Sequence, residues 1–237
     1  MLRKQASPYR RRAAQRTSSV GKICQAVIDT SRCDEIPMAN LGEQFAEAYW
    51  ARHGLKAERF SKEEIGQGKT PDFRVFKAGE LVAYCESKHV QYDDWLDEKF
   101  KTAQPLELVG GPRHDPIFNR IVGHIHKAYK QFTAVNPNRE YSNVLVFTNS
   151  DKQCDNRDLV AVMTGNFYVE GGGAEPIYTA YSEGRIKEEK FAIDLYVWFE
   201  ESKGQGQKGF HYFIANGPHY AALCALLGSD SSKHVRP

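Results

Sequence analysis

The feature that most constrains the fold is a pair of apolar segments, 73–76 and 81–90, separated by Ala78-Gly79. Both segments are rich in aromatic and β-branched residues, and the dipeptide between them supplies a turn. This pattern predicts a β-hairpin over residues 70–90. Hairpin packing gives no reason for three charged residues in it, which are Asp72, Glu86 and Lys88.

The side chains of Glu86 and Lys88 point the same way, because they are two positions apart on one strand. A three-residue turn over 78–80 pairs Lys77 with Leu81. That register sets Asp72 opposite Glu86, with the two acids on one face and about 5 Å apart. A two-residue turn would shift the register by one and separate them.

The second strand of the hairpin carries apolar residues on both faces, which is typical of a buried strand. Glu86 and Lys88 are expected to share their face with Val82, Tyr84 and Val90, whereas Leu81, Ala83 and Cys85 occupy the other. Buried charges need a compensating partner or a function. The alternative interpretation is an ion pair on an exposed strand edge.

Two adjacent carboxylates repel each other unless a cation lies between them. Carboxylate oxygens suit Mg²⁺, which keeps several waters and binds phosphate oxygens as well. A neighbouring lysine can orient or activate such a water and stabilise charge on a phosphate. The hairpin therefore carries the groups needed for metal-assisted phosphodiester hydrolysis.

Pro71-Asp72, thirteen intervening residues and then Glu86-Ser87-Lys88 resemble the PD-(D/E)XK nuclease superfamily. The resemblance implies a restriction-endonuclease-like α/β (α+β) fold with a mixed sheet and an αβββαβ core over about residues 40–150. It implies that Asp72, Glu86 and the backbone carbonyl of Ser87 hold Mg²⁺, with Mn²⁺ able to substitute. Lys88 would position or activate the attacking water.

A helix is predicted from Leu41 to about His53, with Asn40 as its N-cap. This segment is similar to the first helix of many PD-(D/E)XK nucleases, several of which place a metal-binding glutamate there. By its position after Gly42, Glu43 fits that role best, and Glu47 is the second choice. Alternatively, both are surface glutamates of an amphipathic helix.

Other elements follow from apolar periodicity and turn residues. Helices are expected at about 21–36, 92–103, 115–135, 158–164 and 218–227, and strands at 56–60, 143–148, 193–199 and 210–215. Residues 66–70 (GQGKT) are interpreted as a loop, because Glu63 stands where a phosphate-binding loop requires glycine. Residues 151–237 form a C-terminal elaboration that matches no known motif.

The charge is distributed unevenly along the 237 residues. Residues 1–22 hold seven Lys or Arg and no acid, which leaves 25 basic and 30 acidic residues in 23–237. We therefore expect a basic N-terminal arm followed by a single domain. The arm is interpreted as binding nucleic-acid phosphates, with a solvated tail or an organelle transit peptide as alternatives.

The expected function is a Mg²⁺-dependent nuclease acting on DNA, with a restriction or anti-phage defence endonuclease as the preferred subtype. RNA is not excluded, and a repair or RNA-processing nuclease is an alternative. Another is a catalytically silent nucleic-acid-binding or scaffold protein. Cutting both strands would need two active sites, as in a homodimer. The absence of a long apolar run and five scattered cysteines predict a cytoplasmic protein without a membrane span.

Overall fold

The structure, a computed structural model, describes residues 23–30, 41–91, 95–109, 114–169, 173–177, 184–202, 206–215 and 217–233. The predicted basic arm, residues 1–22, lies outside the described residues.

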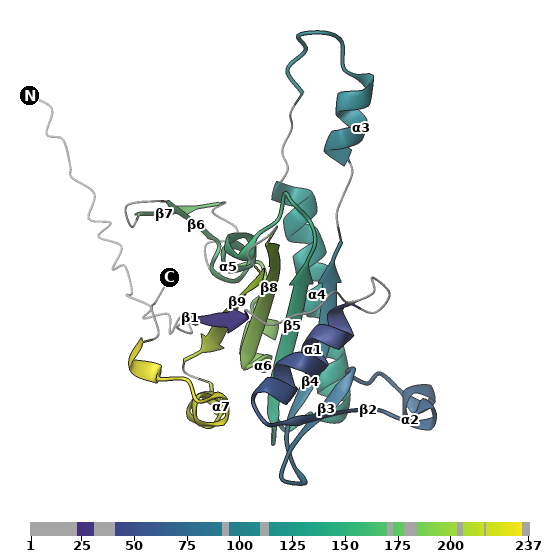
Figure 1. Ribbon diagram of the computed structural model, residues 1–237, viewed down its shortest axis with the longest axis vertical. Coiled ribbons are helices and arrows are strands. Elements are labelled where there is room, and N and C mark those ends of the chain that lie inside the picture. Colours follow the sequence, from purple (N-terminus) through teal and green to yellow (C-terminus); the bar gives the residue numbers. More distant parts are fainter. Residues whose placement is uncertain are drawn as a thin grey trace, which may run out of the picture.

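The described chain has a mixed α/β fold, as predicted, and it is built on a seven-stranded sheet (Figure 1). The strands lie in the order β1-β9-β8-β5-β4-β3-β2. They are β1 (Ile23–Thr30), β2 (Lys56–Arg59), β3 (Phe73–Lys77), β4 (Glu80–Val90), β5 (Ser142–Asn149), β8 (Leu195–Ser202) and β9 (Gly206–Ile214). Strands β4, β5 and β8 run parallel, and the other neighbours are antiparallel.

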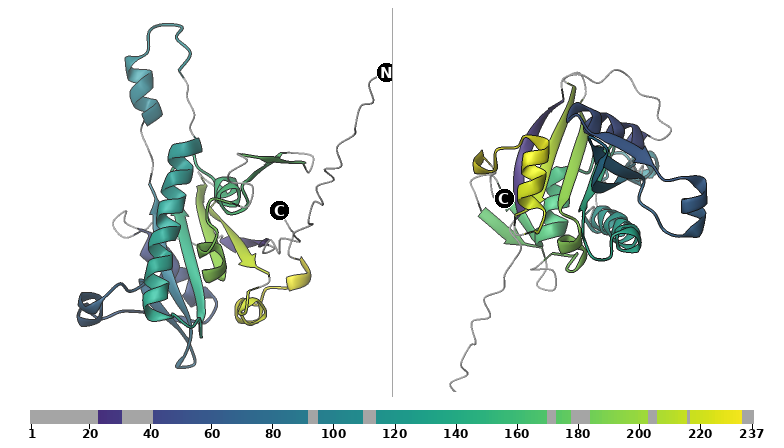
Figure 2. Two further views of the ribbon diagram at one scale, coloured as in Figure 1. Left: turned by 180° about the vertical axis from the view of Figure 1, so that it is seen from behind. Right: turned by 90° about the horizontal axis from the view of Figure 1, so that it is seen from below.

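Helices cover both faces of this sheet (Figure 2). Helices α1 (Leu41–Arg52) and α7 (Tyr220–Leu227) pack on one face, with α4 (His114–Val135) and α5 (Asn156–Thr164) on the other. The shorter helices are α2 (Lys62–Gln67), α3 (Trp95–Thr102) and α6 (Glu189–Ala192). A small second sheet pairs β6 (Asn166–Val169) with β7 (Gly173–Pro176), and a 3₁₀ turn, η2, spans Ser231–Lys233.

The predicted order of helix, three strands, helix and strand occurs as α1, β2, β3, β4, α4 and β5. The two shorter helices interrupt it, because α2 lies before β3 and α3 before α4. A capping box between Ser61 and Glu64 begins α2, which the sequence interpretation did not include. Strands β8 and β9 extend the same sheet beyond β5.

The helix predicted over about 21–36 is wrong, because residues 23–30 form strand β1. This strand pairs antiparallel with β9 along its whole length. Its β-branched residues favour an extended backbone. The long-range pairing with β9, nearly two hundred positions away, decides the structure here.

The predicted three-residue turn of the central hairpin is also wrong. Lys77 pairs with Glu80, so the turn contains only Ala78 and Gly79, whose φ angles are 50° and 88°. Such a turn suits the twist of a hairpin. A β-bulge then restores the expected register, because Val75 pairs with Ala83 and Phe76 with Leu81.

The bulge leaves Val82 without a partner on β3. It also exchanges two predicted side-chain directions: Leu81 packs on the α4 side and Val82 on the α1 side. Beyond the bulge the prediction holds, since Tyr84 and Val90 face α4 while Cys85 faces α1. The strand is therefore apolar on both faces around Glu86.

Helix α3 stands away from the body, at the top of Figure 1. Its Phe100 and the following Leu106 and Leu108 are exposed. In the part of the chain that the structure describes, no helix has the length and apolar character needed to cross a membrane.

Candidate functional site

Asp72 and Glu86 meet where β3 begins beside the middle of β4. The backbone N–H of Asp72 donates to Oε2 of Glu86 (2.9 Å), and Oδ2 of Asp72 accepts the backbone N–H and the hydroxyl of Ser87 (2.8 Å each). Each acid is therefore held by the backbone of the other strand. The structure brings together the two carboxylates that the sequence predicted to converge.

Glu86 is the most unusual group of this site, because its side chain is only 1% exposed. Burial and the nearby charge of Asp72 raise the pKa of Glu86 to about 7, against the lowering effect of Lys88. Lys88 forms an ion pair with Oε1 of Glu86 and remains partly exposed at 18%. A buried carboxylate with this pKa is a candidate functional group.

Helix α4 supplies Gln131, a residue that sequence reasoning missed. Its Nε2 donates to the carbonyl of Thr70 (2.8 Å), just before Pro71-Asp72. A hydrogen bond from Gln131 also lowers the pKa of Glu86. Gln131 thus ties α4 to both strands of the site. Its buried Oε1 lacks a hydrogen-bond partner among the described residues.

A pocket of about 470 Å³ opens beside these residues. The connection between α2 and β3 forms one wall, and α4 forms the other. Its polar lining consists of Lys69, Thr70, Lys88, Lys127, Lys130 and Gln131. No Asp or Glu is among its lining residues.

His124 lies one turn before Lys127 on α4 and remains neutral near pH 7. Burial, followed by the positive charges of Lys88 and Lys127, lowers the pKa of His124 to about 4. Its ring contacts Phe147 edge-on, so it fills part of the core under α4. His126, two positions later, instead pairs with Glu189 on α6.

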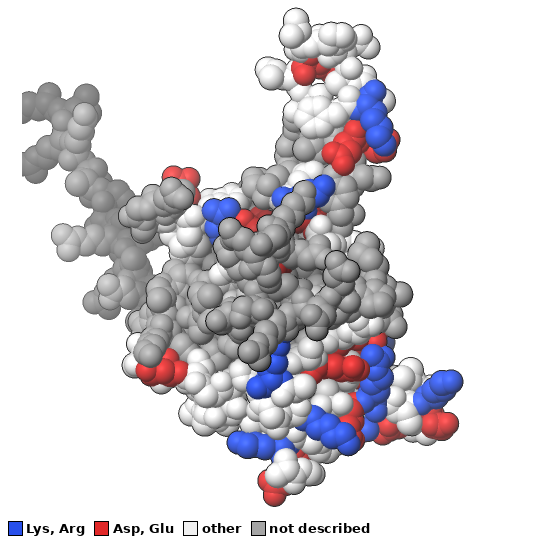
Figure 3. Space-filling model, in the orientation of Figure 1, with Lys and Arg blue, Asp and Glu red and all other residues white. Residues whose placement is uncertain are grey.

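Glu43 and Glu47 lie on the first two turns of α1, where both contact Arg59 on β2. The first turn approaches β4 closely, since a Cβ at Gly42 would lie 3.7 Å from Ser87 Oγ. Basic and acidic side chains lie side by side on the face shown in Figure 3. The structure thus places the backbone of Glu43 near β4, whereas the side chain of Glu43 forms an ion pair with Arg59.

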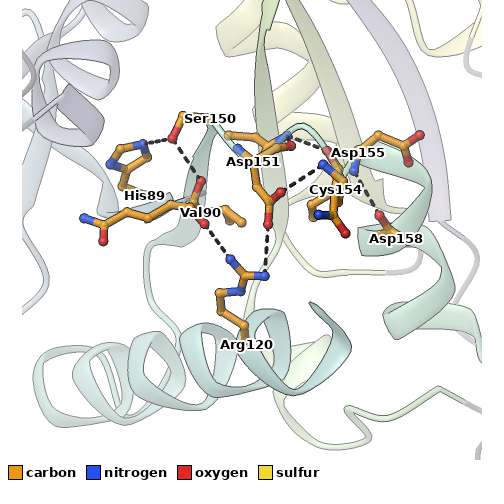
Figure 4. Close-up of polar contacts among 11 residues, drawn as sticks. His89, Val90, Arg120, Ser150, Asp151, Cys154, Asp155 and Asp158 are labelled. Carbon is orange, nitrogen blue, oxygen red and sulfur yellow. Dashed lines mark hydrogen bonds and ion pairs between the residues drawn. The ribbon is translucent and has the colours of Figure 1, made fainter. Parts of the chain in front are cut away.

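A second polar cluster joins the carboxyl ends of β4 and β5 (Figure 4). His89 Nε2 lies 2.8 Å from Ser150 Oγ, so His89 is turned toward β5 and away from Asp72. Arg120 on α4 binds the carbonyl of Gln91 and the carboxylate of Asp151. This cluster fixes the start of α4 to the strand ends.

Within the described residues, no group of three or more His, Cys, Asp or Glu side chains is arranged to hold a metal. In this part of the chain, Asp72 and Glu86 therefore form a pair without a third carboxylate. The remaining ligands of a Mg²⁺ ion there would be backbone carbonyls, water or substrate oxygens.

Comparisons of the chain with family models, with curated proteins and with solved structures found no match.

A periodic pattern in the sequence could have found the α4 contribution. Arg120, His124, Lys127 and Gln131 recur at intervals of four, three and four, which places them along one face of a helix. Their composition is polar, whereas Ile121, Ile125 and Phe132 mark the core face. The pattern indicates a polar stripe but not which strand it faces.

Proposed function

We propose that this protein is a metal-dependent phosphodiesterase that cleaves nucleic acid, with DNA as the preferred substrate. The observation that carries the proposal is the junction of Asp72 and Glu86 beside Lys88 at the edge of a lysine-lined pocket. Two carboxylates and an ammonium next to a basic pocket suit a divalent ion and a phosphate together.

The residues present fit a divalent metal. Oδ2 of Asp72 accepts two hydrogen bonds, whereas its Oδ1 receives none from the residues that the structure describes. Glu86 is buried beside a like charge, which raises its pKa and leaves its ionised form in need of a cation. Asp72, Glu86 and the carbonyl of Ser87 would hold Mg²⁺ or Mn²⁺. A bound ion would polarise the phosphate and its water.

Lys88 has a separate role in the proposed reaction. Its ammonium donates hydrogen bonds to the reacting phosphate and to the attacking water. The water oxygen forms a bond to phosphorus while the bond from phosphorus to the leaving sugar oxygen breaks. One proton of the water passes to solvent, and the leaving oxygen gains a proton from solvent.

Glu43 is proposed as an auxiliary carboxylate, with Glu47 as the alternative. Arg59 contacts both, so recruitment of Glu43 requires a change of rotamer at an ion pair that is partly exposed. Such exposed pairs contribute little stability, typically about 0–1 kcal/mol. Release of Glu43 is therefore energetically accessible.

A silent nucleic-acid-binding protein of the same fold is the second candidate. The ion pair between Lys88 and Glu86 favours it, because each charge already satisfies the other. The raised pKa of Glu86 weighs against it, since a purely structural pair would hold its carboxylate ionised.

Further details of the proposed function rest on the sequence resemblance. They include a restriction or anti-phage defence role, a cytoplasmic location and a homodimer that cuts both strands. Repair and RNA-processing roles remain alternatives, and RNA is an alternative substrate.

The test is incubation of the full chain with plasmid, linear DNA and RNA, each with Mg²⁺, Mn²⁺ or a chelator. We expect cleavage of DNA with either metal and none with the chelator. Retained binding without cleavage of any substrate under any divalent metal would favour the silent protein.

A further inference from the structure

The pocket beside Glu86 concentrates positive charge from three separate elements. Lys69 comes from the connection after α2, Lys88 from β4, and Lys127 and Lys130 from α4. Like charges this close repel one another, and low-dielectric walls strengthen their combined field. Such an arrangement raises the local concentration of anions.

Three of these four lysines have no acidic partner among the residues that the structure describes. Lys88 pairs with Glu86, whereas Lys69, Lys127 and Lys130 make no ion pair with any acid in the described ranges. Other exposed lysines do pair locally, as Lys56 does with Glu58 and Lys101 with Glu98. The three lysines thus present uncompensated charge to whatever enters the pocket.

The α2 wall of the pocket has no role in the core. Helix α2 contributes no buried residue, and its Ile65, which lines the pocket, is 56% exposed. The pair between Arg74 and Glu64 and the capping box at Ser61 hold the helix in place. An apolar side chain opposite lysines suits a ligand with both apolar and anionic parts, as a nucleotide strand has.

The size of the pocket favours a chain of phosphates over one small anion. Its volume of about 470 Å³ lies within the range of sites for drug-sized ligands. It also adjoins Lys88, where the reacting phosphate would lie. An oligonucleotide that presents one phosphate at Lys88 would bring its neighbouring phosphates into reach of α4.

We propose that Lys127 and Lys130, with Lys69 opposite them, bind the backbone phosphates that flank the phosphate reacting at Lys88. The proposal rests on the proposed nuclease function. It assigns α4 as the element that positions the nucleic-acid strand along the pocket. Phosphate contacts of this kind fix the register of a strand without reading its sequence.

The test measures binding without cleavage. A fluorescent duplex DNA of about 20 base pairs is titrated with the full chain in chelator, over about 0.05–0.3 M KCl. Lys127→Gln and Lys130→Gln should each reduce the slope of log affinity against log salt by about 0.9, because each removes one phosphate contact. Lys77→Gln, at the exposed hairpin tip, is the matched control and should leave the slope unchanged.

The outcomes separate this inference from the proposed function. Unchanged slopes in Lys127→Gln and Lys130→Gln would overturn it, as would an equal reduction in Lys77→Gln. Mg²⁺-dependent cleavage by the wild type would still stand in that case. Slopes that are reduced in the two variants, together with a wild type that never cleaves, would support the phosphate surface and remove the nuclease function. Thermal unfolding of each variant checks that the fold is retained.

Discussion

Asp72 and Glu86 are joined by a backbone hydrogen bond although their charges repel: the N–H of Asp72 donates to Glu86 Oε2 over 2.9 Å. The strand residue after Glu86 returns the contact, because the N–H of Ser87 donates to Asp72 Oδ2. Side chains thus replace a regular ladder bond at the point where β3 begins. The position of each acid depends on the other, so substitutions at either should affect both.

Asp72→Asn keeps the size of the side chain and removes its charge. We expect loss of Mg²⁺ binding and a fall in cleavage of roughly 100-fold or more, since the cation that would stabilise the developing negative charge is no longer held. The pKa of Glu86 should fall, because Asp72 raises it. Calorimetric titration with Mg²⁺ measures the loss of metal binding, and a cleavage assay measures the loss of activity. Glu80→Gln, an exposed acid beside the hairpin turn, should behave as wild type.

Lys88→Ala separates catalysis from metal binding. Cleavage should be abolished, whereas Mg²⁺ should still bind at Asp72 and Glu86. Because Lys88 lowers the pKa of Glu86, its removal should raise that pKa and move Mg²⁺ binding to higher pH. Calorimetry at several pH values and a cleavage assay test this, with Lys77→Ala as control. Normal cutting by Lys88→Ala would show that the assigned role is incorrect.

Glu43 and Glu47 both form ion pairs with Arg59, but Glu43 lies in the first turn of α1 and Glu47 lies one turn further along the helix. Glu43 follows Gly42, whose backbone approaches Ser87 and Lys88. Glu43→Gln should therefore weaken Mg²⁺ affinity by roughly 10-fold, the effect typical of an outer ligand. Glu47→Gln should leave it unchanged. Equal affinities in the two variants would return both residues to the role of surface partners of Arg59.

The convergence of Asp72 and Glu86 was predictable from the sequence, although part of the reasoning was wrong. The turn holds one residue fewer than predicted, and the bulge at Val82 adds one residue to β4. The two differences cancel, so Asp72 still lies beside Glu86. Neither Val82 nor its neighbours carry a bulge signal, because all are apolar and suit either face.

Contacts between distant segments were harder to predict. Periodicity located α4 and β5, but the interaction of Gln131 with Thr70 spans 61 positions. No local pattern encodes such a contact. Residues 23–30 show the same limitation, since their pairing with β9 outweighs a weak helical pattern.

Glu86 should make the stability of the metal-free protein depend on pH. Its pKa is about 7 in the folded state, raised mainly by burial from an ordinary 4.5. Below pH 4.5 it is protonated in both states, and its neutral form is tolerated in the fold. Between about pH 4.5 and 7 the unfolded chain releases this proton more readily, so stability falls as pH rises. The loss is on the order of 3 kcal/mol, from about 1.4 kcal/mol per pKa unit.

Glu86→Gln isolates this effect, because the amide does not titrate and fits the same space. In chelator, the free energy of unfolding measured with urea should be larger for the variant than for wild type by on the order of 3 kcal/mol at pH 8. This difference should be nearly absent at pH 4.5. Titrating groups that do not interact with Glu86 cancel in this comparison. Mg²⁺ should stabilise the wild type at pH 8, where Glu86 is ionised, and should not stabilise the variant. A stability difference that is constant from pH 4.5 to 8 would contradict the raised pKa, and stabilisation of the variant by Mg²⁺ would place the metal elsewhere.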